Sequence, residues 1–442
     1  MKRLLRTLIL LLVRIFGFPS AYLSTRHALR HPVTVPRILL IRPDHLGDLV
    51  MTTPILQALK EQIPNAHITM MVGPWSSAVV ERHPAIDHLL TCPFPGFQRA
   101  AQHPLAPYTL LLSTARQLQR EHYDLAINLR PDFWWGAALL YLARIPQRIG
   151  YSIQPGIPFL THALPFLQPE HATISNLRLA SAALQALGYP PLTEPYTPAR
   201  YPLSFTPTPE EHAWVAQQLQ QANIDAQTPI IVIHAGTGGA VKLWRTEAWA
   251  HIANTLTQKS LSSQNMSVLP KHLADLSANT PHFDSLADHL PPTHIVLTGS
   301  NNEHPMLEEI ARHMTTPPLL LTSTTVGQLA ALLHRATLIL GVDNGPLHLA
   351  ITQNRPTLRL YGPTDSRIFG PWGAPEQHIV ITATQRCATC PAIPCGRLDW
   401  DPKELPAHPC VRLITEQKVE EAVASLLPPP SAPSATSHVA SR

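Results

Sequence analysis

The chain has 442 residues, of which 45% are hydrophobic, so it can bury the cores of two or three domains. Only 14% of the residues are charged, and Leu, Ile and Val occur throughout, which excludes an intrinsically disordered protein. The net charge of +4 is spread along the chain and excludes a nucleic-acid-binding protein, which needs a clustered basic face. No uninterrupted apolar run reaches about 18 residues, so we expect no membrane-spanning helix. The five cysteines are too few for a secreted disulfide scaffold and indicate a reducing compartment.

Residues 1–23 combine basic and apolar side chains. A signal peptide does not fit, because Arg14 interrupts the apolar stretch and no A-x-A cleavage site follows. On a helix, one face collects the apolar residues Leu4, Leu5, Leu8, Leu12, Ile15 and Phe16. The pattern predicts an amphipathic helix on an anionic membrane surface, with a helix packed on its own protein as the alternative.

From residue 37 onward, short apolar runs alternate with amphipathic helical stretches. The runs predict buried strands at 37–41, 67–72, 124–129, 230–234, 294–299, 318–322 and 337–342. Between them the sequence predicts helices that include Ala78–Arg82, Glu210–Gln220, Glu303–Met314 and Val326–Arg335. This alternation is typical of an α/β doubly wound fold with parallel sheets.

A proline-rich stretch, 185–208, predicts a linker between two such domains. We therefore expect a leader (1–36), an N-terminal domain (37–205), a C-terminal domain (206–427) and a disordered tail (428–442). The C-terminal domain also contains an inserted loop (259–292) and a Cys/Pro-rich segment (385–410).

The loop that follows the first strand, RPDHLGDLVMTTP (42–54), places two carboxylates where ligands bind in doubly wound sheets. Gly47 permits a tight turn, and Asp48 follows it at the expected start of a helix. Asp48 is therefore either a helix cap or a partner of the helix dipole, which the spacing alone favours, or a general base facing a ligand. Asp44 fits both roles as well.

The loop HAGTGGAVKLWRTEAW (234–249) contains three glycines and Lys242 before an expected helix. Free amides, a helix N-terminus and a lysine are typical of a phosphate site, although neither a dinucleotide fingerprint nor a P-loop is present. A flexible connector is the alternative. In a third loop, GVDNGPLHLA (341–350), Asp343 or Asn344 can cap the next helix and direct a second set of amides at the same anion.

The strings RPDHLGDLVMTTP, HAG…K-x-W, TGSNNE and VDNGPLHLA…LYGPT occur in this order. Together they resemble the lipopolysaccharide heptosyltransferases of glycosyltransferase family 9, over roughly residues 37–420. The resemblance implies a GT-B fold, in which an acceptor-side and a donor-binding Rossmann-like domain face each other across a cleft. It also implies inverting transfer of a sugar, typically heptose from ADP-heptose, to a lipid-linked saccharide. This transfer uses no cofactor and takes place at the cytoplasmic face of the inner membrane.

Position by position, the resemblance gives the motif residues roles. Asp48 corresponds to the catalytic base, and Lys242 to the lysine on the donor diphosphate, with Thr237 in the same loop. Glu303 corresponds to the acidic residue that hydrogen-bonds donor hydroxyls. The donor-phosphate motif corresponds to Asp343, Asn344, Gly345 and His348.

Inversion requires the base and the leaving group on opposite sides of the anomeric carbon, and Asp48 and Lys242 indeed belong to different expected domains. A lysine and two helix N-termini can stabilise a leaving diphosphate, so we expect no metal in the catalytic site. Arg42 and Arg130 are candidates for binding acceptor phosphates or carboxylates, with solvated surface arginines as the alternative.

Four cysteines, Cys387, Cys390, Cys395 and Cys410, follow the spacing C-x2-C-x4-C-x14-C. Such a set could hold a structural zinc ion or an iron–sulfur cluster. We expect reduced packing thiols instead, because members of the family resembled often carry cysteines here without an assigned metal.

The sequence thus predicts an inverting glycosyltransferase that takes a nucleotide-sugar donor and a lipid-linked acceptor. It would attach peripherally to the inner membrane through the N-terminal helix. Two alternatives are a sugar-nucleotide 2-epimerase of the same fold and a non-catalytic protein that binds nucleotide sugars. The amphipathic leader argues against the epimerase, and the presence of both Asp48 and Lys242 argues against the binding protein.

Overall fold

The computed structural model describes residues 2–30, 34–97, 103, 105–265, 293–401 and 403–427. The chain forms two compact units, Met1–Phe205 with Arg367–Gly373, and Thr206–Ser366 with Ala374–Arg442. Part of the expected insertion, 266–292, and the tail 428–442 lie outside the described residues.

The sequence analysis places Arg367–Gly373 in the C-terminal domain, and the structure corrects this. The segment packs with the first unit, where Trp372 Nε1 donates a hydrogen bond to the carbonyl of Tyr201 at 2.7 Å. The Trp372 ring also stacks on that of His171, with 4.9 Å between the centroids. A buried tryptophan thus joins the segment to the first unit.

The first unit is built on a six-stranded parallel sheet with the order β3-β2-β1-β4-β5-β6. Its strands are β1 (Arg37–Arg42), β2 (His67–Val72), β3 (His88–Thr91), β4 (Leu125–Asn128), β5 (Gln147–Tyr151) and β6 (His162–Leu164). The central strand β1 is buried along almost its whole length, which explains its continuous apolar sequence.

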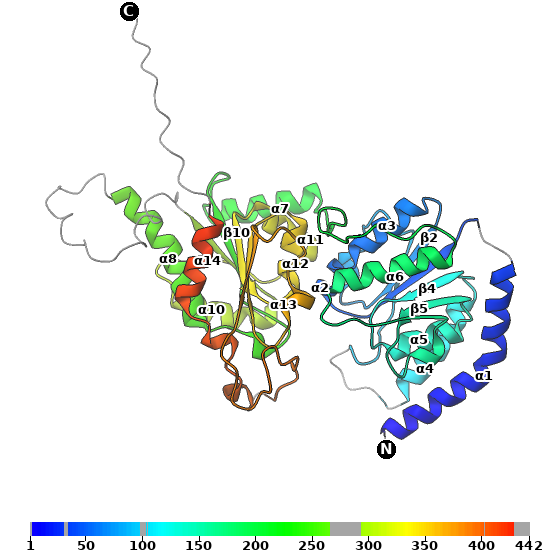
Figure 1. Ribbon diagram of the computed structural model, residues 1–442. Coiled ribbons are helices and arrows are strands. Elements are labelled where there is room, and N and C mark those ends of the chain that lie inside the picture. Colours follow the sequence, from blue (N-terminus) through cyan, green and yellow to red (C-terminus); the bar gives the residue numbers. More distant parts are fainter. Residues whose placement is uncertain are drawn as a thin grey trace, which may run out of the picture. The chain divides into compact units, whose positions relative to one another are not determined.

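Helices cover both faces of this sheet (Figure 1). They are α1 (Lys2–Arg30), α2 (Leu46–Val50), α3 (Thr53–Gln62), α4 (Ala106–Gln119), α5 (Trp134–Leu142) and α6 (Ala172–Ala186), with short 3-10 turns η1 (Ser77–Val79) and η2 (Ile157–Phe159). Helices α3 and α6 pack together, as do α4 and α5. The helix predicted at Ala78–Arg82 is wrong, because only the turn η1 forms there.

The second unit repeats this architecture with the order β12-β11-β10-β7-β8-β9. Its strands are β7 (Ile230–His234), β8 (His294–Thr298), β9 (Leu319–Leu321), β10 (Leu338–Val342), β11 (Thr357–Tyr361) and β12 (His378–Thr382). Its described helices are α7 (Pro209–Gln221), α8 (Thr246–Asn265), α10 (His304–Arg312), α11 (Val326–Arg335), α12 (Gly345–Thr352) and α14 (Glu416–Leu426). Helix α13 (Ser366–Phe369) lies, apart from Ser366, in the segment that belongs to the first unit. The 3-10 turns are η3 (Ala240–Lys242), η5 (Asn301–Glu303), η6 (Leu405–Ala407) and η7 (Val411–Leu413). The predicted α/β class with two parallel sheets is confirmed.

Counted from the first strand of each unit, both sheets have the order 3-2-1-4-5-6. In each sheet the direction in which successive strands are added reverses between the first and the fourth strands. Ligands of doubly wound sheets bind beyond the carboxyl ends of the strands at this switch point. The loops after β1 and β4, and after β7 and β10, are therefore where a site is expected.

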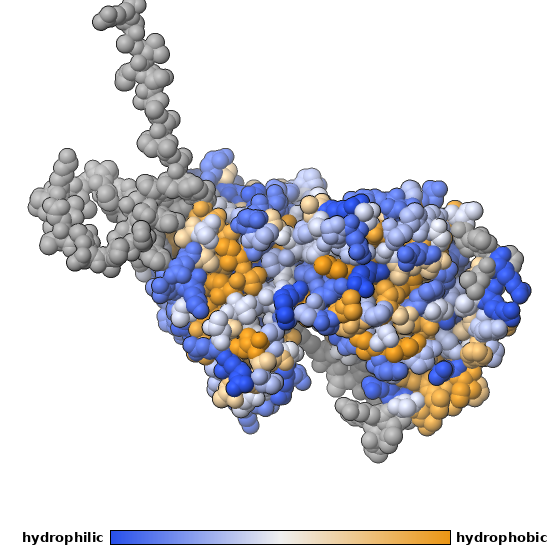
Figure 2. All heavy atoms as spheres, in the orientation of Figure 1, coloured by the Kyte–Doolittle hydropathy of each residue, from blue (hydrophilic) through white to orange (hydrophobic). Residues whose placement is uncertain are grey.

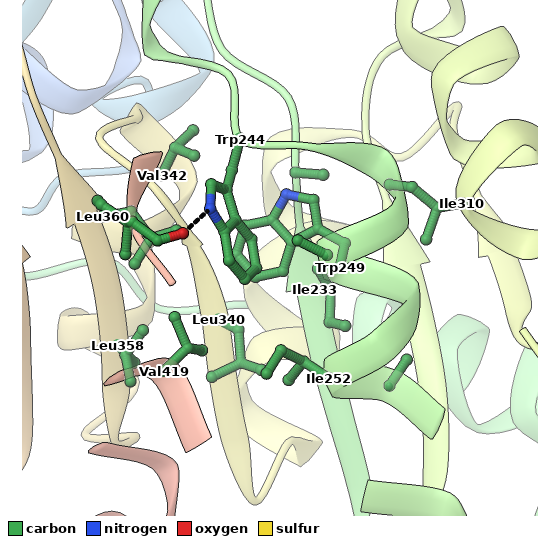
Figure 3. Packing of buried hydrophobic residues seen from close by; sticks show 14 of the residues in the cluster. Ile233, Trp244, Trp249, Ile252, Ile310, Leu340, Val342, Leu358, Leu360 and Val419 are labelled. Carbon is green, nitrogen blue, oxygen red and sulfur yellow. Dashed lines mark hydrogen bonds between the residues drawn. The ribbon is translucent and has the colours of Figure 1, made fainter. Parts of the chain in front are cut away.

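The core of the second unit is anchored by two tryptophans (Figure 3). Trp244 and Trp249 meet edge to face, with 4.8 Å between the ring centroids. The Trp244 indole donates a hydrogen bond to the carbonyl of Ile414 at 2.9 Å. This bond ties the loop after β7 to the segment that leads into α14, so a core contact fixes one end of a candidate site loop.

Helix α1 is longer than the predicted 1–23, and one side of it packs on α5. Gly17 lies so close to Tyr141 that a Cβ atom would come within 2.5 Å of its ring, and the Tyr141 hydroxyl donates to the Arg14 carbonyl at 2.8 Å. The predicted absence of a helix that could span a membrane is wrong. Arg6–Arg26 is long and apolar enough by length and composition, because Leu, Ile, Val and Phe outweigh the few arginines.

Candidate functional site

The loop after β1 places Asp48 in the first turn of α2. The N-cap position belongs to His45, and Oδ1 of Asp48 instead accepts a hydrogen bond from Arg42 Nη2 at 3.1 Å. Asp48 is therefore not the N-cap residue, although its place in the first turn is one where a carboxylate interacts favourably with the helix dipole. Arg42 holds the carboxylate of Asp48, and 29% of the Asp48 side chain is exposed, so a ligand can reach it.

Arg42 is the centre of a buried polar network and is only 5% exposed. Its Nε lies 2.7 Å from Oδ2 of Asp44, and its Nη1 donates to the Leu129 carbonyl at 3.1 Å and to Asn176 Oδ1 at 3.3 Å. The interpretation of Arg42 as a solvated surface residue is wrong, because every group that it contacts here is itself buried or part-buried. Through its hydrogen bond to Oδ1, the buried Arg42 fixes the position of the Asp48 carboxylate.

Arg130, after β4, forms ion pairs with Asp44 and with Asp132. Its side chain is 34% exposed, so it is anchored by Asp44 while part of the guanidinium remains accessible. Arg42, Asp44, Asp48 and Arg130 line one cavity of about 290 Å³ together with Asn176. The switch point of the first sheet thus carries a pocket with two arginines and two carboxylates; these residues are called the first-unit site below.

The surroundings of Asp48 raise the pKa of its carboxyl to about 6. Burial is the main cause, and the negative charge of Asp44 adds to it, while Arg42 and Arg130 act in the opposite direction. A carboxylate with this pKa is ionised at neutral pH and is a stronger proton acceptor than an ordinary aspartate. This is the property that a general base requires.

In the second unit, hydrogen bonds join the loop after β7 to the loop after β10. Asn344 Nδ2 donates to the carbonyls of His234 and Gly236 at 3.2 and 2.9 Å. The Thr237 hydroxyl donates to the Asp343 carbonyl at 3.2 Å. The two loops therefore form one surface at the switch point of the second sheet.

Lys242 lies at the end of η3 and is directed by Asp343. Its Nζ donates to Oδ2 of Asp343 at 3.1 Å, and the Thr364 hydroxyl donates to the same oxygen at 2.7 Å. Asp343 is buried, with 7% of its surface exposed. The buried carboxylate of Asp343 thus positions the Lys242 ammonium beside the glycine-rich loop.

Glu303 closes the same surface from η5, after β8. Its Oε2 accepts hydrogen bonds from the backbone and hydroxyl of Ser300 at 2.7 and 2.8 Å. Its Oε1 lies against Gly236, where a Cβ atom would come within 2.0 Å. The carboxylate is therefore oriented by Ser300, and Gly236 is required by its close approach.

Helix α12 begins at the same surface. Asn344 caps it by accepting a hydrogen bond from the Leu347 amide at 3.2 Å, and Pro346 has no N–H. Gly345 supplies the amide at the start of the helix. His348 is buried, with Nδ1 3.4 Å from Nη1 of Arg359, and so lies behind this turn.

The structure therefore brings the predicted residues Thr237, Lys242, Glu303, Asp343, Asn344 and Gly345 together at one sheet edge. Two residues that the sequence analysis did not single out belong to this second-unit site. Thr364 lies in the quoted LYGPT string, which could have identified it. His234 donates to or accepts from Thr298 at 2.8 Å, and burial lowers its pKa to about 4, so it is neutral at pH 7.

The chain matches the model of glycosyltransferase family 9 (heptosyltransferase) over residues 111–264 and 279–398. These ranges include Arg130 and the second-unit site, but not Arg42, Asp44 or Asp48. It is 26% identical to lipopolysaccharide heptosyltransferase 3 of Escherichia coli K12 over 334 residues, which cover 74% of this chain and 82% of the relative.

Two solved structures share the fold. A family 9 glycosyltransferase from Veillonella parvula superposes with a TM-score of 0.66 at 22% identity and covers 90% of this chain and 99% of its own. The E. coli ADP-heptose lipopolysaccharide heptosyltransferase II superposes with a TM-score of 0.61 at 20% identity and covers 88% and 98%.

Proposed function

Because this chain belongs to glycosyltransferase family 9, we propose that it transfers heptose from ADP-heptose to a lipid-linked saccharide of the lipopolysaccharide-core type. The observation that carries the proposal is the second-unit site, in which Lys242 and the start of α12 meet at a switch point. The names of the relatives support the choice of sugar and acceptor.

The second-unit site would bind the donor. The Lys242 ammonium and the Gly345 amide offer positive charge to a diphosphate. Their stabilising effect increases as the leaving ADP becomes more negative. The oriented carboxylate of Glu303 would accept hydrogen bonds from sugar hydroxyls. Asp343 would position Lys242 and Thr364 rather than touch the phosphates, since a carboxylate repels them.

The first-unit site would activate the acceptor. Asp48 would take the proton of an acceptor hydroxyl, the hydroxyl oxygen would form a bond to the anomeric carbon, and the bond from that carbon to the diphosphate would break. Arg42 would orient the base, and the accessible part of Arg130 would contact acidic groups of the acceptor.

Titration calorimetry with ADP-heptose, ADP and UDP tests the donor assignment. We expect ADP-heptose and ADP to bind with one site per chain and UDP to bind far more weakly. Equal affinity for UDP, or no binding of ADP, would refute the assigned donor.

Gly236→Ala should weaken donor binding, because the added methyl group occupies the position of the Glu303 carboxylate. Loss of a hydrogen bond to a charged group costs about 1.5–3 kcal/mol, so we expect affinity for ADP-heptose to fall about tenfold or more. Gly156→Ala in the first unit is the control, since the nearest atom to its Cβ position, the Ile153 carbonyl oxygen, lies 3.3 Å away and the residue is outside the donor site. Equal affinities of the two variants in calorimetry would remove Glu303 from the donor site.

Helix α1 would attach the enzyme to the cytoplasmic face of the inner membrane. The side turned away from α5 exposes large apolar residues, which form the orange patch at the lower right of Figure 2: Leu8, Leu11, Leu12, Ile15, Phe16 and Phe18. Hydrogen bonds from Ser24 and Thr25 to the carbonyls of Arg144 and Pro146 hold the helix on the first unit. A docked helix with an apolar outer face and exposed Arg14 favours a position in the plane of an anionic surface.

Replacing Leu12, Ile15 and Phe16 together by Ser should release the protein from phosphatidylglycerol vesicles. Each exposed side chain contributes about 1.5–3 kcal/mol when fully buried, so we expect vesicle affinity in co-sedimentation to fall about 100-fold or more. Leu112→Ser with Leu167→Ser is the matched control, because these leucines are similarly exposed on the same unit. Unchanged vesicle binding by the triple variant would contradict attachment through α1.

A further inference from the structure

The segment between β12 and η6 has no helix or strand in its described residues, 383–401, 403 and 404. Loops of this length without helices or strands are uncommon and are usually functional or disordered. Three cysteines lie in this segment, and His408 and Cys410 follow just after η6. The segment nevertheless packs into the core of the second unit.

The side chains of Cys387, Cys390 and His408 converge. Their ligand atoms all lie within 4.8 Å of one another, and Cys390 Sγ is 3.3 Å from Nδ1 of His408. The amide of Cys390 donates to the carbonyl of Cys387 at 3.1 Å, so the C-x2-C turn directs both sulfurs to one side. The three residues are buried, with 4, 6 and 5% of their surfaces exposed.

The fourth position is best filled by Cys410. Cys410 follows His408 by two residues, and like the other three it is buried, with 3% of its surface exposed. Cys395 interacts with Cys390 but is partly exposed, and its sulfur is directed to the Arg397 carbonyl at 4.0 Å. The Trp400 ring covers His408, with 3.4 Å between the centroids.

We propose that Cys387, Cys390, His408 and Cys410 bind a structural zinc ion. Zinc prefers four tetrahedral sulfur and nitrogen ligands, and its bond lengths place neighbouring sulfur and nitrogen ligands about 3.6 Å apart. The 3.3 Å separation of Cys390 and His408 already approaches this value. Binding would release the protons of the thiols and close the segment into a fixed loop. The convergence of His408 on the C-x2-C turn, which the cysteine spacing does not predict, is the observation that favours this proposal over packing thiols.

The segment also supports the loops of the second-unit site. The Gly396 amide donates to the Pro363 carbonyl at 2.8 Å, one residue before Thr364, and the Leu398 carbonyl lies 3.9 Å from the Cβ position of Gly239. At Gly362 a Cβ atom would come within 2.9 Å of Cys410 Sγ. Loss of zinc should therefore weaken ADP binding, a consequence that rests on the proposed function, whereas the metal site itself does not.

Elemental analysis of the full-length protein, purified from cells that are grown with both zinc and iron in the medium, tests the proposal. We expect about one equivalent of zinc per chain, and its replacement by Co²⁺ should give the visible absorption of a tetrahedral cobalt–thiolate centre. Cys387→Ser, His408→Ala and Cys410→Ser should each lose the metal. Cys395→Ser and Cys92→Ser, the matched controls, should retain it, and all variants are checked for folding by circular dichroism.

A wild-type chain with no stoichiometric metal would overturn the proposal, whether or not the variants fold. Iron in place of zinc would overturn the choice of metal. Loss of metal from Cys395→Ser with retention in His408→Ala would overturn the ligand set. Normal metal content without ADP binding would leave the zinc site standing and count against the proposed donor alone.

Discussion

Asp48→Asn should reduce the rate constant of heptosyl transfer by at least about 100-fold, because general-base catalysis contributes about 10²–10⁴-fold. The asparagine keeps the shape of the side chain and can still accept a hydrogen bond from Arg42, but it cannot accept a proton at neutral pH. Affinity for ADP-heptose should change little, because the residues assigned to the diphosphate lie in the second unit. Calorimetry beside a transfer assay separates the two effects.

The pH profile gives a second test of the same residue. The base acts in its ionised form, so kcat/KM of the wild type should rise as the pH increases through about 6 and then level off. This limb should be absent from the residual activity of Asp48→Asn. The raised pKa also means that the folded state binds this proton more tightly than the unfolded state, in which the pKa is near 3.8. The stability contributed by Asp48 is thus lost as the pH rises through about 6, and the substitution should not lower the unfolding free energy at pH 8.

Asp87→Asn is the control for Asp48→Asn. It replaces an aspartate of the same unit that pairs with Lys60 outside the cavity, and its turnover should equal that of the wild type. Turnover near the wild-type value in Asp48→Asn would remove Asp48 from the mechanism and direct attention to Asp44.

Lys242→Ala should impair both donor binding and turnover. Loss of a charge-assisted contact costs about 1.5–3 kcal/mol, which corresponds to an affinity for ADP-heptose lower by about 10- to 150-fold. Turnover should fall by about 100-fold as well, because the lysine charge is worth most when the diphosphate leaves. Calorimetry and the transfer assay measure the two changes, and Lys242→Arg should retain part of both.

The pairing of Lys242 with Asp343 makes this prediction sharper. In the wild type, Lys242 and the Thr364 hydroxyl both donate to the Asp343 carboxylate. Without the lysine, the negative charge of this carboxylate is no longer balanced by Lys242 and repels the phosphates. The double variant Lys242→Ala/Asp343→Asn should therefore bind ADP-heptose more tightly than Lys242→Ala alone. Lys60→Ala is the control for removal of a lysine that pairs outside the site. Unchanged ADP affinity in Lys242→Ala would show that the diphosphate binds elsewhere.

The central strands were predictable because burial on both faces leaves an almost continuous apolar signature, as in β1, β7 and β10. Strands β3, β6 and β12 were missed because they are short or partly exposed at the sheet margins. In β5 and β11 a buried arginine interrupts the apolar run. Arg359 is fully buried in β11 and donates to the Leu347 carbonyl at 2.6 Å, a contact that no local pattern predicts.

The site residues divide in the same way. The loops after β1, β7 and β10 were found because glycines, a lysine and capping residues follow buried strands at short spacing. Asn176 could not be found, because it lies in α6, more than a hundred residues from the arginine that it contacts. The buried state of Arg42 was missed for the same reason: the partners that stabilise its charge come together only in the folded sheet.

The most direct test of the account is mass spectrometry of the products after the purified chain is incubated with ADP-heptose and a heptose-deficient core lipid. We predict a lipid heavier by one heptosyl residue, formed together with an equal amount of ADP and dependent on Asp48. An isomerised nucleotide sugar with unchanged lipid would identify an epimerase instead. Tight binding of ADP-heptose without turnover would identify a binding protein, and either result would contradict the proposed transfer.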